Sequence, residues 1–167
     1  MVEVTARFGP GAVVPTWDPD VFVARGWYDP AERVYLLVYR SGDATHRDRN
    51  ARGAPPVVSA TLATVGHLQA EQWHDKALTV KDLGRPRLPL KSLSGPNGIK
   101  LGDARNTVFR ILGAGELAGR RGDIDTYSYY NVYPGAHSVG CAEAGFFILQ
   151  VTFTGGRLTK IHVREAS

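Results

Sequence analysis

The sequence predicts an α+β protein built from antiparallel β-sheets, with one main helix packed on the carboxy-terminal sheet. Residues 98–113 have the glycine punctuation and apolar spacing of a single amphipathic helix. Three stretches rich in β-branched and aromatic residues follow it, at residues 124–133, 146–154 and 157–164. The apolar face of the helix needs a sheet to cover it, so we expect the helix and these strands to pack together.

The predicted helix has a start signal, an apolar face and a stop signal. Asp103 stands at the expected N-cap, because a carboxylate accepts hydrogen bonds from the free N–H groups of the first turn and suits the positive end of the helix dipole. Val108, Ile111 and Leu112 recur at i, i+3 and i+4, so we expect them to share the buried face. Gly113 stands where a left-handed C-terminal cap is expected.

Residues 1–85 predict an amino-terminal antiparallel β subdomain. Residues 2–8 are expected to form an arm or an edge strand. Residues 21–28 and 33–40 predict a hairpin, because the Asp-Pro-Ala-Glu between them favours a type I turn. The second strand of this hairpin is apolar on both of its alternating sides, so we expect both faces to be covered.

Less regular segments follow that hairpin. Residues 41–56 contain hardly any apolar side chain and predict a long loop, and residues 57–65 return to a strand pattern. Residues 66–76 fit either a short helix or a loop, and residues 77–81 fit one more short strand.

A proline-rich connector is predicted at residues 86–97. Pro86, Pro89 and Pro96 favour extended backbone over helix or sheet. We therefore place the boundary of the amino-terminal subdomain here, and residues 98–167 form the helix-plus-sheet part.

The carboxy-terminal sheet contains the strongest hairpin signal in the chain. Gly-Gly at 155–156 suits the positive φ angles of a type I′ turn between residues 146–154 and 157–164. Residues 114–123, which are glycine-rich and basic, and residues 134–145 are expected to form loops. The apolar face of the hairpin is predicted to consist of Phe147, Leu149, Val151, Phe153, Ile161 and Val163. The opposite face of the last strand is predicted to carry Lys160, His162 and Arg164.

The composition is that of an ordinary globular protein. No window approaches 18 consecutive apolar residues, so we expect no transmembrane segment. The single cysteine, Cys141, excludes an internal disulfide and the usual cysteine-rich zinc site. The net charge of +4 and a pI near 9.4 favour weak attraction to anionic polymers. Lys and Arg are scattered among 16 acidic residues, however, so there is no strong nucleic-acid signal.

One loop gathers residues with catalytic chemistry. His137, Cys141 and Glu143 could pair a thiolate with a base or hold a metal. No oxyanion-stabilising feature accompanies them, so a turn with a half-buried thiol is the favoured interpretation. Asp123 and Asp125 lie two residues apart at a strand start, which predicts solvated carboxylates and not an acid–base pair.

Metal binding has one further candidate. His67 and His74 would share a face if residues 66–76 were helical, with Glu71 between them. No other residue is nominated as the third ligand, and simple packing of Trp73 beside His74 explains this segment. We therefore expect no metal, no cofactor and no catalytic residue.

Five pieces of the carboxy-terminal half occur in a characteristic order. They are Gly-Ile-Lys-Leu-Gly-Asp at 98–103, Val108, Ile-Leu-Gly at 111–113, Tyr-Ser-Tyr at 127–129 and Val-Thr-Phe-Thr-Gly-Gly-Arg-Leu at 151–158. In this order residues 98–164 resemble the outer-membrane assembly lipoprotein family called SmpA, OmlA or BamE, and more broadly the β-lactamase-inhibitor-protein-like fold. The resemblance implies binding by a sheet surface or loops, and its motifs are structural, not catalytic.

The predicted binding residues are aromatic and basic. Tyr127, Tyr129 and Tyr133 alternate along one strand and fit either a concave docking face for a peptide or protein, or core packing under the helix. Arg120 and Arg121 precede them and attract anions weakly.

These observations favour a non-enzymatic protein- or ligand-binding or assembly module of the bacterial cell envelope or secreted fraction, with a protein or peptide as partner. The location that follows is periplasmic or secreted, with the cytoplasm as the alternative. Two other functions stay open. One is a small enzyme around His137 and Cys141, and the other is a weak polyanion binder through Arg120, Arg121, Lys160 and Arg164.

Overall fold

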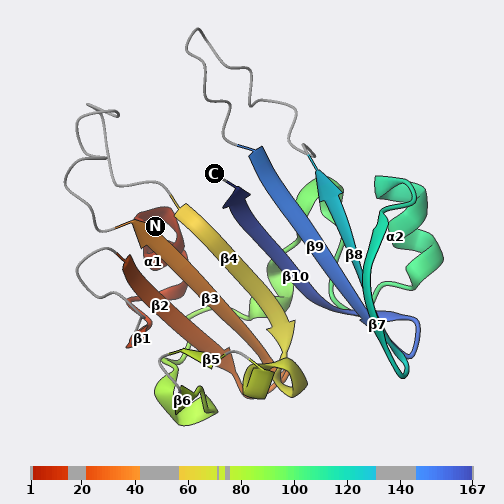
Figure 1. The fold of residues 1–167 in the computed structure, drawn as a ribbon. Helices are drawn as coiled ribbons and strands as arrows, with labels where there is room; N and C mark the ends of the chain where they lie inside the picture. Colours follow the sequence, from red (N-terminus) through yellow and green to blue (C-terminus); the bar gives the residue numbers. More distant parts are fainter. Residues whose placement is uncertain are drawn as a thin grey trace, which may run out of the picture. The chain divides into compact units, whose positions relative to one another are not determined.

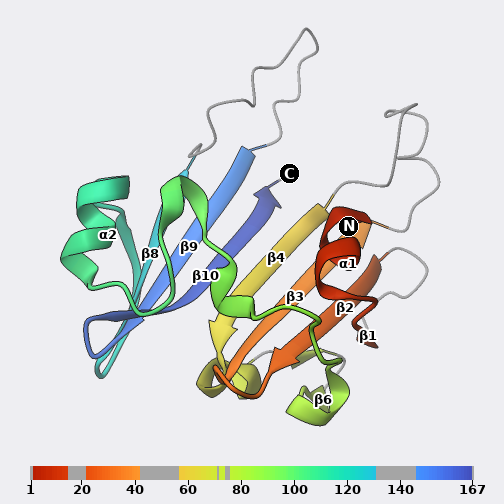
Figure 2. The ribbon, with the colours of Figure 1, turned by 180° about the vertical axis from the view of Figure 1, so that it is seen from behind.

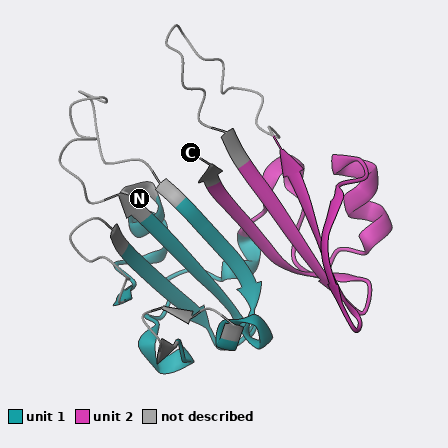
Figure 3. Cartoon of the chain, in the orientation of Figure 1, with its two compact units in different colours: residues 1–92 teal, residues 93–167 magenta. Residues whose placement is uncertain are grey.

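The computed structural model describes residues 2–14, 22–41, 57–70, 72–73, 76–130 and 146–166. The chain divides into two compact units, Met1–Ser92 and Leu93–Ser167 (Figure 3). In the described residues neighbouring strands pair antiparallel, which confirms the predicted antiparallel sheets. The two α-helices there have seven and eight residues, so the fold is mostly β and not the α+β balance that the sequence predicts.

Unit 1 contains a four-stranded sheet in the order β1-β2-β3-β4 and a small β5–β6 pair (Figures 1 and 2). Its helices are α1 (Val2–Phe8) and the 3-10 turns Val65–Ala70, Val80–Asp82 and Leu90–Ser92. Its strands are β1 (Ala12–Val14), β2 (Phe22–Asp29), β3 (Val34–Ser41), β4 (Val57–Thr64), β5 (Gln72–Trp73) and β6 (Lys76–Ala77).

Strand β3 is buried on both of its faces, as predicted. Tyr35, Leu37 and Tyr39 belong to a core cluster with residues of β1, β2, β4 and the following 3-10 turn. The alternating residues Val34, Leu36 and Val38 point to the other face and are buried as well. This pattern is typical of a sheet covered on both sides.

The β2–β3 hairpin is confirmed. Two residues of its turn, Asp29 and Glu32, also bind residues of the predicted connector. One carboxylate oxygen of Asp29 accepts the N–H groups of Ala31 and Glu32, and the other accepts the N–H of Leu90 at 3.1 Å. Lys91 pairs with Glu32 at 2.8 Å. Leu90 is fully buried, so this part of residues 86–97 packs against unit 1.

Residues 2–8 form helix α1, so the prediction of a strand there is wrong. The helix ends where the Gly9 N–H donates to the Thr5 carbonyl at 2.9 Å, and Phe8 at its end is buried. A short apolar run does not by itself distinguish a strand from a helix turn, and burial of Phe8 favours the helix here.

The predictions for residues 57–81 are confirmed in part. Residues 57–65 form β4, as predicted. Residues 66–76 begin with a 3-10 turn, and residues 77–81 contain only the end of β6 and the start of another 3-10 turn instead of a strand. Apart from Ser41, the predicted loop at 41–56 lies outside the described residues.

Unit 2 contains four antiparallel sheet strands, in the order β10-β9-β8-β7. Figure 2 shows α2 and the segment that leads to it on the near side of these strands, and Figure 1 shows the strands from the opposite side. Its elements are the 3-10 turn Pro96–Gly98, α2 (Arg105–Leu112), β7 (Glu116–Arg121), β8 (Ile124–Tyr130), β9 (Phe146–Thr154) and β10 (Arg157–Ala166).

Helix α2 begins one residue later than predicted. Ala104 is the N-cap, and Asp103 instead accepts the Lys100 N–H with its carboxylate at 2.8 Å. The Asp103 carboxylate is therefore held by the preceding turn and does not cap the helix. Gly113 ends the helix and donates its N–H to the Phe109 carbonyl, so the predicted position of the C-terminal cap is confirmed. Its φ of +82° is positive, but its ψ of 177° is extended, so the predicted left-handed conformation is wrong.

The buried face of α2 differs from the predicted one at a single position. Val108 is fully buried and Leu112 packs on the core of unit 2, whereas Ile111 is 38% exposed. Phe109 takes its place, with its ring edge against Tyr127 and Phe153. One turn of 3.6 residues places Val108, Phe109 and Leu112 together, and Ile111 lies at the margin of that face.

Of the two hairpins in unit 2, the sequence predicts β9–β10 but not β7–β8. Gly155 and Gly156 have φ of +57° and +77°, so the predicted type I′ turn between β9 and β10 is confirmed. Residues 114–123 were expected to be a loop, but six of them form β7, all exposed and paired with β8. Pairing with a neighbouring strand outweighs the low strand propensity of Gly119 in this segment.

Candidate functional site

The sheet of unit 2 has two chemically different faces. The apolar face is closed by a core cluster that includes Val108 of α2 and Ile99 of the preceding segment. From the sheet this cluster takes Tyr127, Tyr129, Leu149, Val151, Phe153, Leu158, Ile161 and Val163. The alternating residues of the same strands form the opposite side, which we call the polar face. It consists of Thr126, Ser128, Tyr130, Ile148, Gln150, Thr152, Thr154, Lys160, His162 and Arg164.

The centre of the polar face is made of hydroxyl and amide groups in cross-strand rows. Thr152 lies opposite Thr126 on one side and Lys160 on the other, and the two threonine hydroxyls share a hydrogen bond of 3.1 Å. Gln150 lies between Ser128 and His162 and donates its amide N–H to the Ser128 hydroxyl at 3.2 Å. The lateral bonds hold these short side chains in fixed positions. Ser128 and Thr152 are buried, so Thr126 and Gln150, both half-buried, are the hydroxyl and amide residues of these rows that reach solvent.

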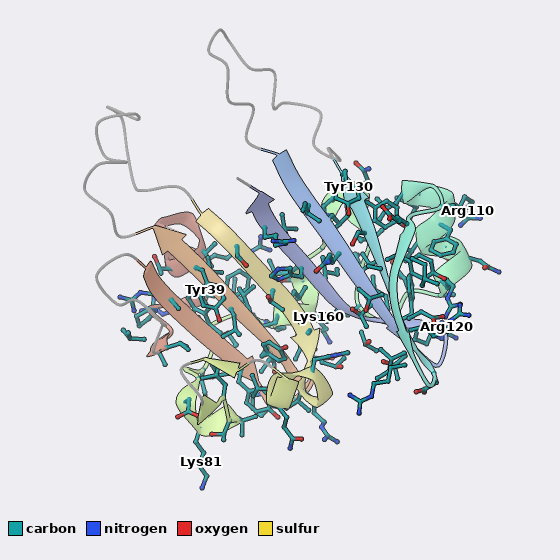
Figure 4. All side chains as sticks on the ribbon, in the orientation of Figure 1. Tyr39, Lys81, Arg110, Arg120, Tyr130 and Lys160 are labelled. Carbon is teal, nitrogen blue, oxygen red and sulfur yellow. The ribbon has the colours of Figure 1, made fainter. Side chains whose placement is uncertain are left out.

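One end of the polar face carries an exposed aromatic ring and a cation. Tyr130 and Arg164 both lie opposite Ile148 on β9, one on each side of it. Tyr130 is 58% exposed, and Figure 4 labels it on β8 together with Lys160 on β10. An exposed aromatic ring and an exposed cation at the same end of one sheet face, separated by a single strand, are side chains suited to partner binding.

Asp125 is part of an ion cluster and is not a solvated carboxylate, so that prediction is wrong. It is 6% exposed and pairs with Arg105 at the start of α2 at 2.5 Å and with Arg120 of β7 at 2.6 Å. The hydrogen bond from Arg120 and the charges of both guanidinium groups lower the pKa of Asp125. Because both oxygens are paired, Asp125 is poorly placed to act as a general base.

Arg105 joins this ion cluster to the apolar core. Its guanidinium carbon lies 5.4 Å from the ring centroid of Phe153 and 6.0 Å from that of Tyr127. Its Nε atom is buried and has no acceptor among the described residues. Asp123, in contrast, is exposed in the β7–β8 turn, as predicted.

The predicted tyrosines lie on the apolar face. Tyr129 is buried, and its hydroxyl donates to the Gly113 carbonyl at 3.1 Å. Burial raises the pKa of this hydroxyl. Tyr127 is half-buried between the rings of Phe109 and Phe153. Of the two interpretations, core packing describes both tyrosines, and Tyr133 lies outside the described residues.

The predicted basic pair is divided between the two faces. Arg120 lies opposite Asp125 and is held by it, although 60% of its side chain is exposed. Arg121 lies opposite Ile124, on the side of the polar face, and is exposed. Figure 4 shows Arg120 on β7 and Arg110 on α2.

The other candidate residues fall largely outside the described part of the chain. His137, Cys141 and Glu143 lie there, and so do Glu71 and His74. His67 is half-buried in the 3-10 turn after β4. Within the described ranges, no three His, Cys, Asp or Glu side chains gather in a geometry that could hold a metal ion.

The sequence predicts the cations of the polar face but not the rows of hydroxyl and amide groups at its centre. Lys160, His162 and Arg164 were expected on the far side of the last strand. Thr126, Ser128, Gln150 and Thr152 were not nominated, although β8 and β9 each alternate polar and apolar residues. That alternation identifies a polar side, whereas the rows depend on strand register, which the sequence does not specify.

Comparisons with protein-family models, with curated proteins and with solved structures give no match. In the described residues no helix has the length and apolar character needed to span a membrane.

Proposed function

We propose that this protein is a non-enzymatic binding module and that the polar face of unit 2 is its recognition surface. The observation that supports the proposal is the contrast between the two faces of one sheet. One face is closed by α2 and the core cluster, and the other carries aligned hydroxyl and amide groups with an exposed tyrosine. Placement in the bacterial envelope or secreted fraction rests on the resemblance of residues 98–164 and belongs to the same proposal.

The charges on this face favour a partner with negative charge. Lys160, His162 and Arg164 follow one another along β10, and Arg121 of β7 lies on the same side. Glu116 is the one acidic side chain that the described strand pairs place there. Complementary charge steers association and selects the partner more than it raises affinity.

An acidic protein segment fits this face better than a nucleic acid. Proteins that bind single strands stack successive bases on several aromatic side chains. Tyr130 is the single aromatic residue on the described part of the polar face. Short hydroxyl and amide groups instead suit the backbone and carboxylates of an extended peptide.

Binding of a fluorescent poly-glutamate peptide, followed by anisotropy at low salt, tests the proposal. We expect the double variant Lys160→Gln/Arg164→Gln to weaken binding several-fold. The matched control Lys81→Gln/Arg110→Gln removes two exposed charges from a 3-10 turn of unit 1 and from α2, and it should bind as the wild type does. Equal losses in both variants would contradict the proposal.

A single-stranded oligonucleotide of equal charge serves as the second probe. Weaker binding of the oligonucleotide than of poly-glutamate supports a peptide partner. Tighter binding of the oligonucleotide, with an affinity that falls steeply as salt rises, would instead favour the polyanion binder.

A further inference from the structure

Strand β7 is the last strand of the unit 2 sheet. It pairs with β8 on one side, and on its other side no described strand pairs with it. All six of its residues are exposed, including Leu117 at 46%. An edge strand of this kind presents unpaired N–H and C=O groups and is a template for another strand.

The charges of β7 are complementary to those of a second β7 strand that runs antiparallel to it. Glu116 stands at one end and Arg121 at the other, and neither side chain has a hydrogen-bond or ion-pair partner among the described residues. When β7 lies antiparallel to a second β7 with residue 116 opposite residue 121, each glutamate meets an arginine. A parallel arrangement in register would place like charges side by side.

The side-chain directions fit the same arrangement. Glu116 lies opposite Ser128 and Arg121 opposite Ile124, so both belong to the side of the polar face. A two-fold axis perpendicular to the sheet keeps that face on the same side in both copies. The glutamate of one copy and the arginine of the other therefore meet on one side of the continued sheet.

The middle of β7 leaves room for a second strand. Ala118 and Gly119 have little or no side chain, and a Cβ placed on Gly119 would have no neighbour within 4 Å. Arg120 is held on Asp125, so its guanidinium group is directed toward the apolar side of the sheet. The register shift between Leu117 and Gly119 increases the local twist, which limits pairing at this edge to a short segment.

We propose that β7 pairs with β7 of a second copy of this chain, antiparallel and with Glu116 opposite Arg121, and so forms a symmetric dimer. The contact uses the same edge on both copies, so the assembly closes at two chains. A single six-residue edge makes a small interface, and the dimer is therefore expected to be weak and dependent on concentration. The proposal does not rest on the acidic partner proposed above, although Arg121 belongs to both surfaces.

Sedimentation equilibrium over a series of protein concentrations tests the dimer. The wild type should associate reversibly. Arg121→Glu and Glu116→Arg each bring like charges together at both ends of the contact, and each should raise the dissociation constant about tenfold. The double variant Glu116→Arg/Arg121→Glu exchanges the two charges and should restore the wild-type value.

The control is Arg110→Glu, because Arg110 is an exposed cation on α2 and not on β7; it should associate as the wild type does. Three results would overturn the proposal: a wild type that stays monomeric at every concentration, single reversals without effect, or a double variant that stays as weak as the singles. Poly-glutamate binding is measured separately, so failure of the dimer leaves the polar face untouched.

Discussion

The strands of the two units are of similar length and differ in the side chains that their two faces carry. In β3 of unit 1 the six residues from Val34 to Tyr39 are buried in succession, and all six are apolar or aromatic. In β9 of unit 2 the buried apolar residues Leu149, Val151 and Phe153 alternate with Gln150, which is half-buried, and Thr152, which is 6% exposed. Apolar faces serve packing alone, whereas a face of polar side chains also offers hydrogen-bonding groups at its solvent-accessible positions.

The two units differ in the same way in their side-chain hydrogen bonds. In unit 1, Asp29 fixes both the hairpin turn and the buried Leu90 segment. In unit 2, one face belongs to the core and the other carries hydrogen-bonded polar side chains.

Alanine replacements at neighbouring positions test what the two faces of each strand contribute to stability. In β3, Leu36→Ala and Leu37→Ala should each lower the free energy of unfolding by about 2–5 kcal/mol, because both leave a cavity. In β9, Leu149→Ala should cost about as much, whereas Gln150→Ala should cost about 1 kcal/mol for one lost hydrogen bond. Urea unfolding measures all four, and a costly Gln150→Ala would break the contrast.

The Asp125 cluster predicts a dependence on pH. The folded protein lowers the pKa of Asp125, so this group adds stability above the unfolded-state value of about 4 and loses that contribution as pH falls through the folded-state pKa. Asp125→Asn should therefore be less stable than the wild type at pH 7, and the difference should shrink below about pH 4. Urea unfolding at pH 7 and pH 3 measures it. A difference that is the same at both pH values would rule out an ionic role.

Two adjacent tyrosines point to opposite faces of β8, so replacing each one tests the difference between the faces, with a smaller expected change in stability. Tyr129→Phe removes the bond to the Gly113 carbonyl and should cost about 0.5–1.5 kcal/mol. Tyr130→Phe changes an exposed side chain and should stay within about 0.5 kcal/mol of the wild type. Thermal unfolding of the pair measures both, and equal losses would show that the faces are not distinct.

Local sequence signals are enough to predict the β2–β3 and β9–β10 hairpins. Helix α1 and strand β7, which were not predicted, depend on contacts with residues far away in the sequence. Gly155-Gly156 and the Asp29 turn each carry their own geometry, so both hairpins were predictable. Helix α1 depends on burial of Phe8, and β7 forms because β8 lies beside it. Neither condition is visible in the residues themselves.

In the candidate site, too, local sequence patterns are enough to predict some features, and long-range contacts determine the others. The cations of β10 follow from simple alternation along one strand. The pairing of Asp125 with Arg105 joins positions twenty residues apart, and it requires α2 and β8 to be already in place. The tyrosines were assigned to the correct strand and to one common face, but their burial depends on Phe109 and Val108 above them.

Methyl NMR spectra recorded during a titration with poly-glutamate test the central claim most directly. The polar face carries the methyl groups of Thr126 and Thr154, which are half-buried, and the apolar face carries those of Leu149 and Val151, which are buried. We predict that the first set shifts and the second set does not, although the two alternate along the same strands. Shifts confined to Leu149, Val151 and unit 1, with the threonines unmoved, would contradict the assignment of the polar face as the recognition surface.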